Sequence, residues 1–267
     1  MTLQSAASDL ELLESGAREA GALCRRLQQK PLDVRSKGAA GPVTNIDLAV
    51  NDLLAEILQS ARPDYGWLSE ETPDRPEARL GKTRVFMLDP IDGTQALVER
   101  TPYFTISVGI VENGQPFAGA VYNPTTDQMY LGAPGAGATL NGEPIRASAR
   151  ERVEGARVVG KRNWYQHAHR WPKPWPEMDY KALPSIAYRL ANVASGAFDF
   201  TILAGPKHEW DIAGGIAILE AAGGVFTDGW GEPFVLNQPL PRTTSGAVAS
   251  GAALHPLLIE RTNFLPR

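Results

Sequence analysis

Residues 88–94 read LDPIDGT, with two aspartates three positions apart, Pro-Ile between them and Gly-Thr directly after. An apolar run from Val85 precedes them, so a buried strand is expected to end at Asp89. Pro90 fixes its own φ and favours an extended residue before it, so a bend here can aim both carboxylates at one point. A plain strand-to-turn junction would need the same residues. The heptapeptide alone favours neither interpretation.

The chemistry of LDPIDGT suits a divalent cation and an anion together. Hard cations such as Mg²⁺ accept carboxylate and carbonyl oxygens alike, and here the Ile91 carbonyl lies between Asp89 and Asp92. If a helix begins at Gly93-Thr94, its free N–H groups form an anion site beside those oxygens. The stretch therefore predicts either the floor of a metal and phosphate site or an ordinary turn.

Further acidic residues lie at the predicted ends of other elements. Glu70 and Glu71 close a short strand, Asp47 lies in the first turn of a helix after Thr44, and Asp211 begins a glycine-rich helix. Each has an ordinary explanation alone, as solvated charge, a first-turn acid or a cap. Together with LDPIDGT they make four acidic sites at four element ends, which favours one shared site.

Periodicity divides the chain into two kinds of sequence. Apolar side chains at helical spacing predict helices over 8–29 and 43–63, and the segment 30–42 between them, which ends in glycines and a proline, predicts a mobile loop. Strands with Asn-Gly turns follow, and helices then alternate with strands. We expect a metal-site lobe over 1–147, with two helices and a mainly antiparallel sheet. An α/β lobe over 148–267 would complete the active site and substrate pocket.

Composition narrows the function classes. The 267 residues are 43% hydrophobic with a formal net charge of −4, which provides a core and argues against a nucleic-acid duplex as partner. The single cysteine, Cys24, cannot form an internal disulfide, which suits a cytoplasmic protein. The N-terminal sequence is not typical of a secretory signal, and no run of about 18 apolar residues predicts a membrane span.

The motifs PVTNID, SEE, DPIDGT and WDIAGG, in that order, resemble those of the inositol monophosphatase superfamily of metal-dependent, lithium-sensitive phosphatases. The resemblance spans Lys37 to about Gly224. It implies a mixed α/β fold, the five-layered αβαβα sandwich, commonly as a homodimer. It also implies a small phosphorylated substrate and two or three Mg²⁺ ions in each active site.

The resemblance also implies roles for individual residues. The implied metal ligands are Glu70, Asp89, the Ile91 carbonyl, Asp92 and Asp211. Phosphate would bind the backbone amides of Gly93 and Thr94, with Lys37 near the metal or phosphate. Asp47 would bond the Thr94 hydroxyl, and this pair would help Glu70 to activate water. Such chemistry needs no protein nucleophile, in agreement with a sequence that shows no Ser/His/Asp or Cys/His signature.

The sequence has features of more than one substrate group of the superfamily. Inositol-specific members usually carry a glutamate seven residues before the aspartate of WD, where this chain has Ala204. LAGPKHEWD instead resembles bacterial 3′(2′),5′-bisphosphate nucleotidases, which convert 3′-phosphoadenosine 5′-phosphate to AMP and phosphate. However, Gln95 replaces a lysine frequent in that branch, and SGAFD resembles the inositol branch. We expect a bisphosphate nucleotidase, with an inositol-1-phosphate or other sugar-phosphate phosphatase as the alternative.

A second substrate phosphate would need cations beyond the metal site. The candidates are Lys161, Arg162, Arg189 and Lys207, each of which is equally well explained as solvated surface charge. Three tryptophans could stack on a base, although loop packing explains them more simply: Trp164, Trp171 and Trp175. The alternative of another class is a catalytically weak binding or regulatory member of the fold. Loss of a metal acid would favour it, and none of the expected acids is missing.

Overall fold

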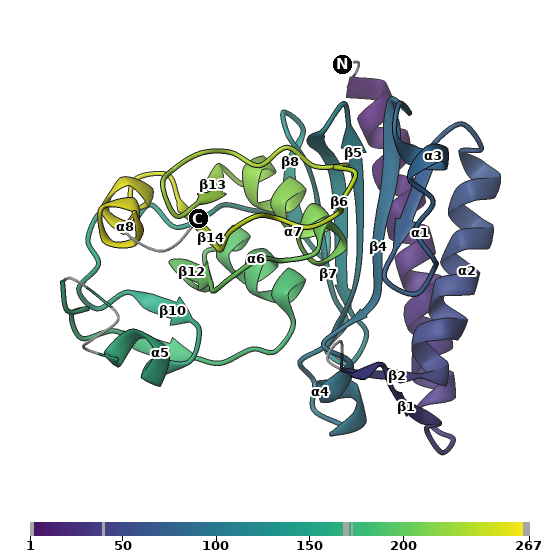
Figure 1. The fold of residues 1–267 in the computed structure, drawn as a ribbon, viewed down its shortest axis with the longest axis horizontal. Coiled ribbons are helices and arrows are strands. Elements are labelled where there is room, and N and C mark those ends of the chain that lie inside the picture. The colour runs from purple at the N-terminus through teal and green to yellow at the C-terminus, as the bar shows by residue number, and fades with distance from the viewer. Residues whose placement is uncertain (1–2, 39–40, 168–170, 172, 264–267) are drawn as a thin grey trace.

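Two β-sheets form the framework of the protein, and helices lie between and outside them (Figure 1). The computed structural model describes residues 3–38, 41–167, 171 and 173–263. The first half of the chain supplies a sheet of seven strands, and the second half a sheet of five. Within the described residues, no helix combines the length and apolar content needed to span a membrane.

Both helices predicted near the N-terminus are present, as α1 (Leu3–Leu27) and α2 (Asn45–Ala61). Between them, β1 (Val34–Ser36) and β2 (Pro42–Thr44) pair antiparallel, where the sequence predicted only a loop. The Thr44 side-chain oxygen caps α2, as the N-cap preference of threonine predicts. The ribbon of β1 and β2 therefore leads the chain directly into the start of α2.

The larger sheet runs from β3 at one edge to β9 at the other. In order, its strands are β3 (Gly66–Ser69), β4 (Arg84–Asp92), β5 (Thr105–Glu112), β6 (Gln115–Asn123), β7 (Gln128–Ala133), β8 (Gly137–Leu140) and β9 (Glu143–Ile145). The first pair is parallel and all others are antiparallel. Both residues of the Asn113-Gly114 and Asn141-Gly142 turns have positive φ, as tight hairpins require.

Helices cover both faces of this sheet (Figure 1). α1 and α2 lie on one face, and α6 (Ile186–Ala194) and α7 (Glu209–Ala221) lie on the other. α7 packs very closely because the strands beneath it carry glycines: a Cβ added to Gly119 would lie 2.2 Å from the Gly214 carbonyl oxygen. The glycine-rich sequence of α7 thus brings its backbone against β5 and β6.

The smaller sheet lies beyond α6 and α7 (Figure 1). In order, its strands are β11 (Asp179–Lys181), β10 (Arg157–Val159), β12 (Phe200–Leu203), β14 (Ala247–Gly251) and β13 (Gly224–Asp228). α5 (Arg162–Gln166) and α8 (His255–Thr262) pack on its outer side, where Tyr165 and Leu258 share one apolar cluster. The succession of helices, sheet, helices, sheet and helices confirms the αβαβα fold.

Two short helices flank the strand that carries LDPIDGT. α3 (Pro76–Arg79) precedes β4, and α4 (Thr94–Val98) follows it. The boundary expected between residues 147 and 148 falls in the connection from β9 to β10. The division into two lobes stays a prediction.

Candidate active site

The LDPIDGT segment bends while it is still part of the sheet. β4 continues to Asp92, so the expectation that the strand ends at Asp89 is wrong. Its pairing with β5 shifts between these two aspartates, since Asp89 lies opposite Ser107 but Asp92 opposite Thr105. The Asp89 Oδ1 accepts the Ile91 backbone N–H at 3.0 Å, which closes the bend. Both carboxylates are buried there, at 3% and 6% exposed.

A helix begins directly after the bend, as the sequence predicts. Gly93 precedes α4 with a φ of 96°, a left-handed conformation that favours glycine. A side chain here would also crowd the fold, because a Cβ would lie 3.2 Å from the Tyr103 carbonyl oxygen. Gly93 therefore lets the chain turn sharply from Asp92 into α4, and Thr94 becomes the first helical residue.

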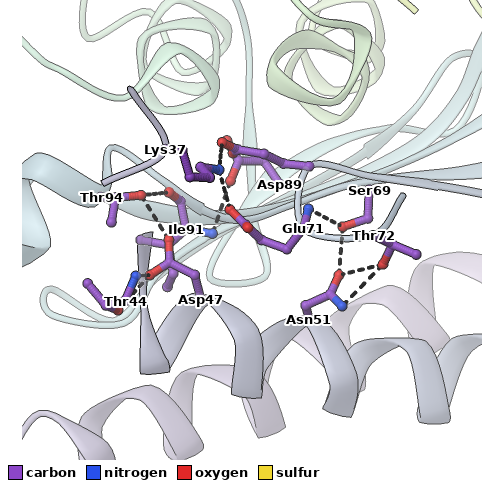
Figure 2. Close-up of polar contacts among 11 residues, drawn as sticks. Lys37, Thr44, Asp47, Asn51, Ser69, Glu71, Thr72, Asp89, Ile91 and Thr94 are labelled. Atoms are coloured by element: carbon purple, nitrogen blue, oxygen red, sulfur yellow. Dashed lines mark hydrogen bonds and ion pairs between the residues drawn. The ribbon is translucent and has the colours of Figure 1, made fainter. Parts of the chain in front are cut away.

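Asp47 connects α2 to this bend (Figure 2). Its Oδ2 accepts the Thr44 backbone N–H at 2.9 Å and the Thr44 hydroxyl at 2.6 Å. The Thr94 hydroxyl lies 2.9 Å from Asp47 Oδ1 and 3.1 Å from the Ile91 carbonyl oxygen, and it can donate to either. Burial raises the pKa of Asp47, and these hydrogen bonds oppose the increase. The expected contact between Asp47 and Thr94 is present, and its role in activating water stays a prediction.

Lys37 lies among the acids rather than in solvent (Figure 2). Its Nζ donates to Glu70 Oε1 and Glu71 Oε1, each at 2.6 Å. Burial lowers the pKa of Lys37, but the hydrogen bonds to both glutamates outweigh this effect and the pKa is raised. The predicted approach of Lys37 to the acidic site is therefore present, through contacts with two carboxylates.

The acids from four segments share one electrostatic environment. The pKa of Asp89 is raised well above its usual range, first by burial and then by the charges of Glu70, Asp92, Asp211 and Asp47. Acids from all four element ends singled out in the sequence therefore contribute to the electrostatic environment of one carboxyl group.

Asp211 approaches from the opposite side of the sheet, in the first turn of α7. Its Oδ2 accepts the His208 backbone N–H at 3.2 Å, so the same carboxylate also caps the helix. Burial raises the pKa of Asp211 well above its usual range, and the charges of Asp92 and Glu70 raise it further. The cap predicted from the sequence is therefore present, and the place of Asp211 in a shared metal site stays a prediction.

Ser185 is a neighbour of the site that the sequence analysis missed. It is fully buried as the N-cap of α6, and its hydroxyl donates to Asp92 Oδ2 at 2.7 Å. The Ala187 backbone N–H donates to the same oxygen at 2.5 Å. Burial raises the pKa of Asp92 to about 6, although these hydrogen bonds oppose the increase. A serine before an apolar helical repeat was the available signal, but it predicts a cap and not the carboxylate it meets.

The donor chemistry of the site fits a hard divalent cation. Carboxylates come from several elements, and burial and the charges of four neighbouring acids raise the pKa of Asp89, so a bound cation would relieve the repulsion among these acids. Over the described ranges, no three acidic, histidine or cysteine side chains already surround a common point. Several carboxylates are bonded elsewhere, as Glu70 is to Lys37 and Asp92 to Ser185. A bound cation would compete with these partners.

Two of the four candidate substrate cations lie close to the acids. Arg189 is partly buried, and its Nε donates to the Leu183 carbonyl at 2.5 Å. Burial lowers the pKa of Arg189, and the charge of Asp92 opposes the decrease. Lys207 interacts with the charge of Asp211, although its Nζ donates to three carbonyls of its own loop, those of Ala204, Gly205 and Pro206.

The other two candidates lie at the end of β10, where the smaller sheet meets α5. Lys161 is the exposed residue before α5, and the Arg162 guanidinium lies 5.2 Å from the centre of the Tyr180 ring. Lys181, which ends the neighbouring strand β11, lies 5.5 Å from the Tyr103 ring centre. The strand ends thus gather cations that the sequence analysis recognised only in part.

The tryptophan-rich segment packs as a core rather than as an open platform. Trp164 and Trp171 have ring centres 4.8 Å apart, and Trp175 lies 5.4 Å from Tyr165 and 5.7 Å from Phe200. Trp171 and Tyr165 are buried. The prediction of packing is therefore confirmed for these residues; positions 168–170 and 172 lie outside the described residues.

Comparisons with known proteins agree with this fold. Residues 7–267 match the inositol monophosphatase family. The chain is 30% identical over 205 residues to the 3′(2′),5′-bisphosphate nucleotidase CysQ of Escherichia coli K12, covering 76% of this chain and 83% of the relative. It is 29% identical over 262 residues to an inositol-1-monophosphatase of Caulobacter vibrioides, covering 94% of this chain and 98% of the relative.

Solved structures give the same result. An IMPase of Thermotoga maritima superposes with a TM-score of 0.80 at 25% identity, covering 98% of this chain and 97% of that one. An inositol monophosphatase of Anabaena superposes with a TM-score of 0.77 at 25% identity, covering 95% of this chain and 94% of that one. Relatives of this family act on small phosphorylated substrates. The chain belongs to the inositol monophosphatase family, as its motifs predicted, and is a metal-dependent phosphoric monoester hydrolase.

Proposed function

We propose that the protein is a Mg²⁺-dependent 3′(2′),5′-bisphosphate nucleotidase, which converts 3′-phosphoadenosine 5′-phosphate to AMP and phosphate. The observation that carries this choice of substrate is the position of the partly buried Arg189, one helical turn after Ser185, whose hydroxyl donates to Asp92 at 2.7 Å. A substrate with one phosphate needs cations only at the reacting group. A partly buried guanidinium beside that group suits a second anionic group of the substrate.

The proposed metal ligands come from two elements, β4 and α7, and from the connection that follows β3. They are Glu70, Asp89, the Ile91 carbonyl, Asp92 and Asp211, and they would hold two or three Mg²⁺ ions. The raised pKa of Asp89, caused by burial and by its acidic neighbours, supports a site that needs added positive charge. When bound, Mg²⁺ lowers the pKa of water, neutralises phosphoryl oxygens and stabilises the leaving alkoxide.

The remaining steps belong to side chains and amides of the chain itself. The amides of Gly93 and Thr94 would bind the reacting phosphate, with Lys37 as a cation nearby. Glu70 would receive a proton from the attacking water. Asp47 fixes the Thr94 hydroxyl at 2.9 Å, which supports the proposal that this pair orients the same water.

The second phosphate would bind on the α6 side of the pocket. Arg189 and Lys207 are the proposed nearest partners, because their charges act on Asp92 and Asp211 respectively. To bind phosphate, the Lys207 Nζ would give up hydrogen bonds that it now donates to carbonyls of its own loop. Lys161 and Arg162 would contribute from the end of β10. The relative named as a bisphosphate nucleotidase, at 30% identity, supports this choice.

A phosphatase acting on inositol 1-phosphate or another sugar phosphate is the second candidate. The relatives named as inositol-1-monophosphatases favour it, at 29% identity for the Caulobacter vibrioides protein and 32% for that of Rhizobium meliloti. The proposal also includes a homodimer in the cytoplasm, supported by the family resemblance and by the single, buried Cys24.

A substrate panel tests the proposal. Phosphate release would be measured with Mg²⁺ for 3′-phosphoadenosine 5′-phosphate, inositol 1-phosphate, fructose 1,6-bisphosphate and histidinol phosphate, and kcat/KM compared. We expect the bisphosphate nucleotide to give the highest value. Arg189→Met should lower that value about 10-fold or more relative to the value for inositol 1-phosphate. Arg261→Met, on the outer side beside Trp175, should leave the ratio unchanged. A highest value for inositol 1-phosphate would overturn the proposal.

A further inference from the structure

Arg79 is a charged side chain that the proposed chemistry does not use, yet it is fully buried at 0% exposed. Its Nε and Nη2 donate to the two Asp74 carboxylate oxygens at 2.7 and 2.8 Å. Its Nη1 donates to Asn237 Oδ1 at 2.8 Å, although these residues lie 158 positions apart in the chain. Arg79 therefore joins the connection before β4 to the loop that follows β13.

The same loop binds the start of α7. The backbone amides of Asn237 and Gln238 donate to the two carboxylate oxygens of Glu209, at 2.7 and 3.1 Å. The Glu209 backbone N–H in turn donates to the Pro241 carbonyl at 3.1 Å. Glu209 is 2% exposed, so its carboxylate is held by these amides inside the protein.

These contacts connect two parts of the proposed metal site. Asp74 lies four residues after Glu70, and Glu209 lies two residues before Asp211. We propose that Arg79, Asn237 and Glu209, here called the clamp, are positioning residues that fix Asp211 relative to Glu70. The inference rests on the proposed function, because it takes Glu70 and Asp211 to be metal ligands.

Packing alone does not account for the clamp. Buried charges are costly to desolvate, and apolar residues of similar volume often stabilise a protein as well or better. Directional bonds, by contrast, fix geometry. The connection from Glu70 to Arg75 belongs to no strand or helix. The Glu70 backbone N–H still donates to the Leu88 carbonyl of β4 at 3.1 Å, so the sheet holds the first residue of the connection but not Asp74. The bidentate pair of Asp74 with Arg79 closes this connection.

The backbone at Asn237 makes a precise variant available. Asn237 has a φ of 61°, which asparagine and glycine adopt most readily. Asn237→Gly keeps this conformation and the amide bonded to Glu209, and removes the side chain that accepts from Arg79 Nη1 and donates to the Arg79 carbonyl at 3.4 Å. Glu209→Gln is nearly isosteric and weakens the carboxylate's bonds to the two amides. Arg79→Met removes the bonds to both Asp74 and Asn237.

Metal binding is the readout that a merely structural role would not change. The metal-free protein would be titrated with Mn²⁺, and free Mn²⁺ followed by electron paramagnetic resonance. We expect Arg79→Met and Glu209→Gln to weaken Mn²⁺ binding about 10-fold, and Asn237→Gly to weaken it several-fold, as for other groups that orient metal ligands. Arg79→Lys should recover part of the loss. The matched control is Arg62→Met, which breaks the ion pair with Asp9 between α1 and α2.

Two outcomes are distinguished by Asp211→Asn, measured in the same way. If Asp211→Asn binds Mn²⁺ as the parent does, the metal assignment fails and the basis of the clamp fails with it. If Asp211→Asn binds weakly while Glu209→Gln and Asn237→Gly bind normally, the clamp is overturned and the metal assignment stands. If Arg79→Met does not fold, Mn²⁺ binding by Glu209→Gln and Asn237→Gly still decides whether the clamp positions Asp211. Equal weakening in Arg62→Met would assign the effect to general destabilisation and overturn the clamp.

Discussion

The Lys37 ammonium lies 2.6 Å from Glu70 Oε1, where it occupies carboxylate bonding capacity that a metal ion would use. It lies equally close to Glu71 Oε1, so one lysine neutralises part of the charge of two acids. If Glu70 is a metal ligand, as proposed, Lys37 competes with the cation for this carboxylate while stabilising the metal-free protein. Removing this competitor should have opposite effects on the metal-free and metal-bound proteins.

Lys37→Met should destabilise the metal-free protein by about 1–3 kcal/mol, because two partly buried carboxylates lose a charged donor. It should also increase the rise in Tm caused by saturating Mg²⁺, since the acids become more negative towards the cation. Thermal unfolding with and without Mg²⁺ checks both effects. Lys37→Arg is the control that keeps the charge. A smaller Mg²⁺-dependent rise in Lys37→Met would contradict the competition.

Asp89→Asn should lower kcat at least about 100-fold, because one proposed metal ligand loses its charge. The fold should persist, since an asparagine oxygen can still accept the Ile91 backbone N–H now 3.0 Å from Asp89 Oδ1. The metal-free variant should even unfold at a higher Tm, because the burial and repulsion that raise the pKa of Asp89 are relieved. Phosphate release and thermal unfolding measure the two effects. Full activity in this variant would refute the metal assignment.

His255 gives a prediction about pH that lies outside the active site. The ring is buried, with Nδ1 2.8 Å from Ser250 Oγ and Nε2 2.9 Å from Thr227 Oγ1, and burial lowers its pKa from 6.5 to about 4. The unfolded chain therefore binds a proton that the folded protein does not. This contribution to stability is complete above pH 6.5 and is lost as the pH falls towards about 4.

Because of this histidine, the free energy of unfolding changes with pH by at most about 1.4 kcal/mol per pH unit. Urea unfolding at several pH values between 4 and 8 measures it, and His255→Gln separates it from the carboxylates that titrate in the same range. We expect the difference in unfolding free energy between the parent and His255→Gln to shrink as the pH falls. A difference that stays constant across the range would show that His255 does not titrate as its burial predicts.

The sequence indicated the candidate acids of the site better than the contacts that these acids make. Asp47, Glu70 and Asp211 were recognisable because acids at element ends follow local rules that any strand or helix obeys. The partner of Asp92 was not recognisable, because Ser185 meets it only when α6 packs on the bend. Contacts between residues far apart in the chain depend on how the layers pack, and no local pattern records them.

The same reason explains why the sheet glycines were not predicted. Gly109 and Gly119 look like breaks in apolar strands, yet they lie where the α7 backbone approaches β5 and β6. A glycine in a strand interior weakens the strand by itself. The close approach of a helix that it permits is therefore visible only in the packed structure. The approach of α7 also brings Asp211 to the other acids, so these glycines contribute to the geometry of the site.

Gly119→Ala tests this close approach. The added Cβ would lie 2.2 Å from the Gly214 carbonyl oxygen, and backbone atoms cannot move aside as a flexible side chain can. We expect a loss of about 1–3 kcal/mol of unfolding free energy, in the range for overpacked cores, with weaker Mg²⁺ activation because α7 is displaced. Gly16→Ala is the matched control, since Gly16 lies in α1 and its added Cβ would lie 3.3 Å from a Leu54 methyl group of α2, at the end of a side chain that can move. Equal stability losses in the two variants, with Mg²⁺ activation unchanged in Gly119→Ala, would show that the closeness of α7 to the sheet does not position Asp211.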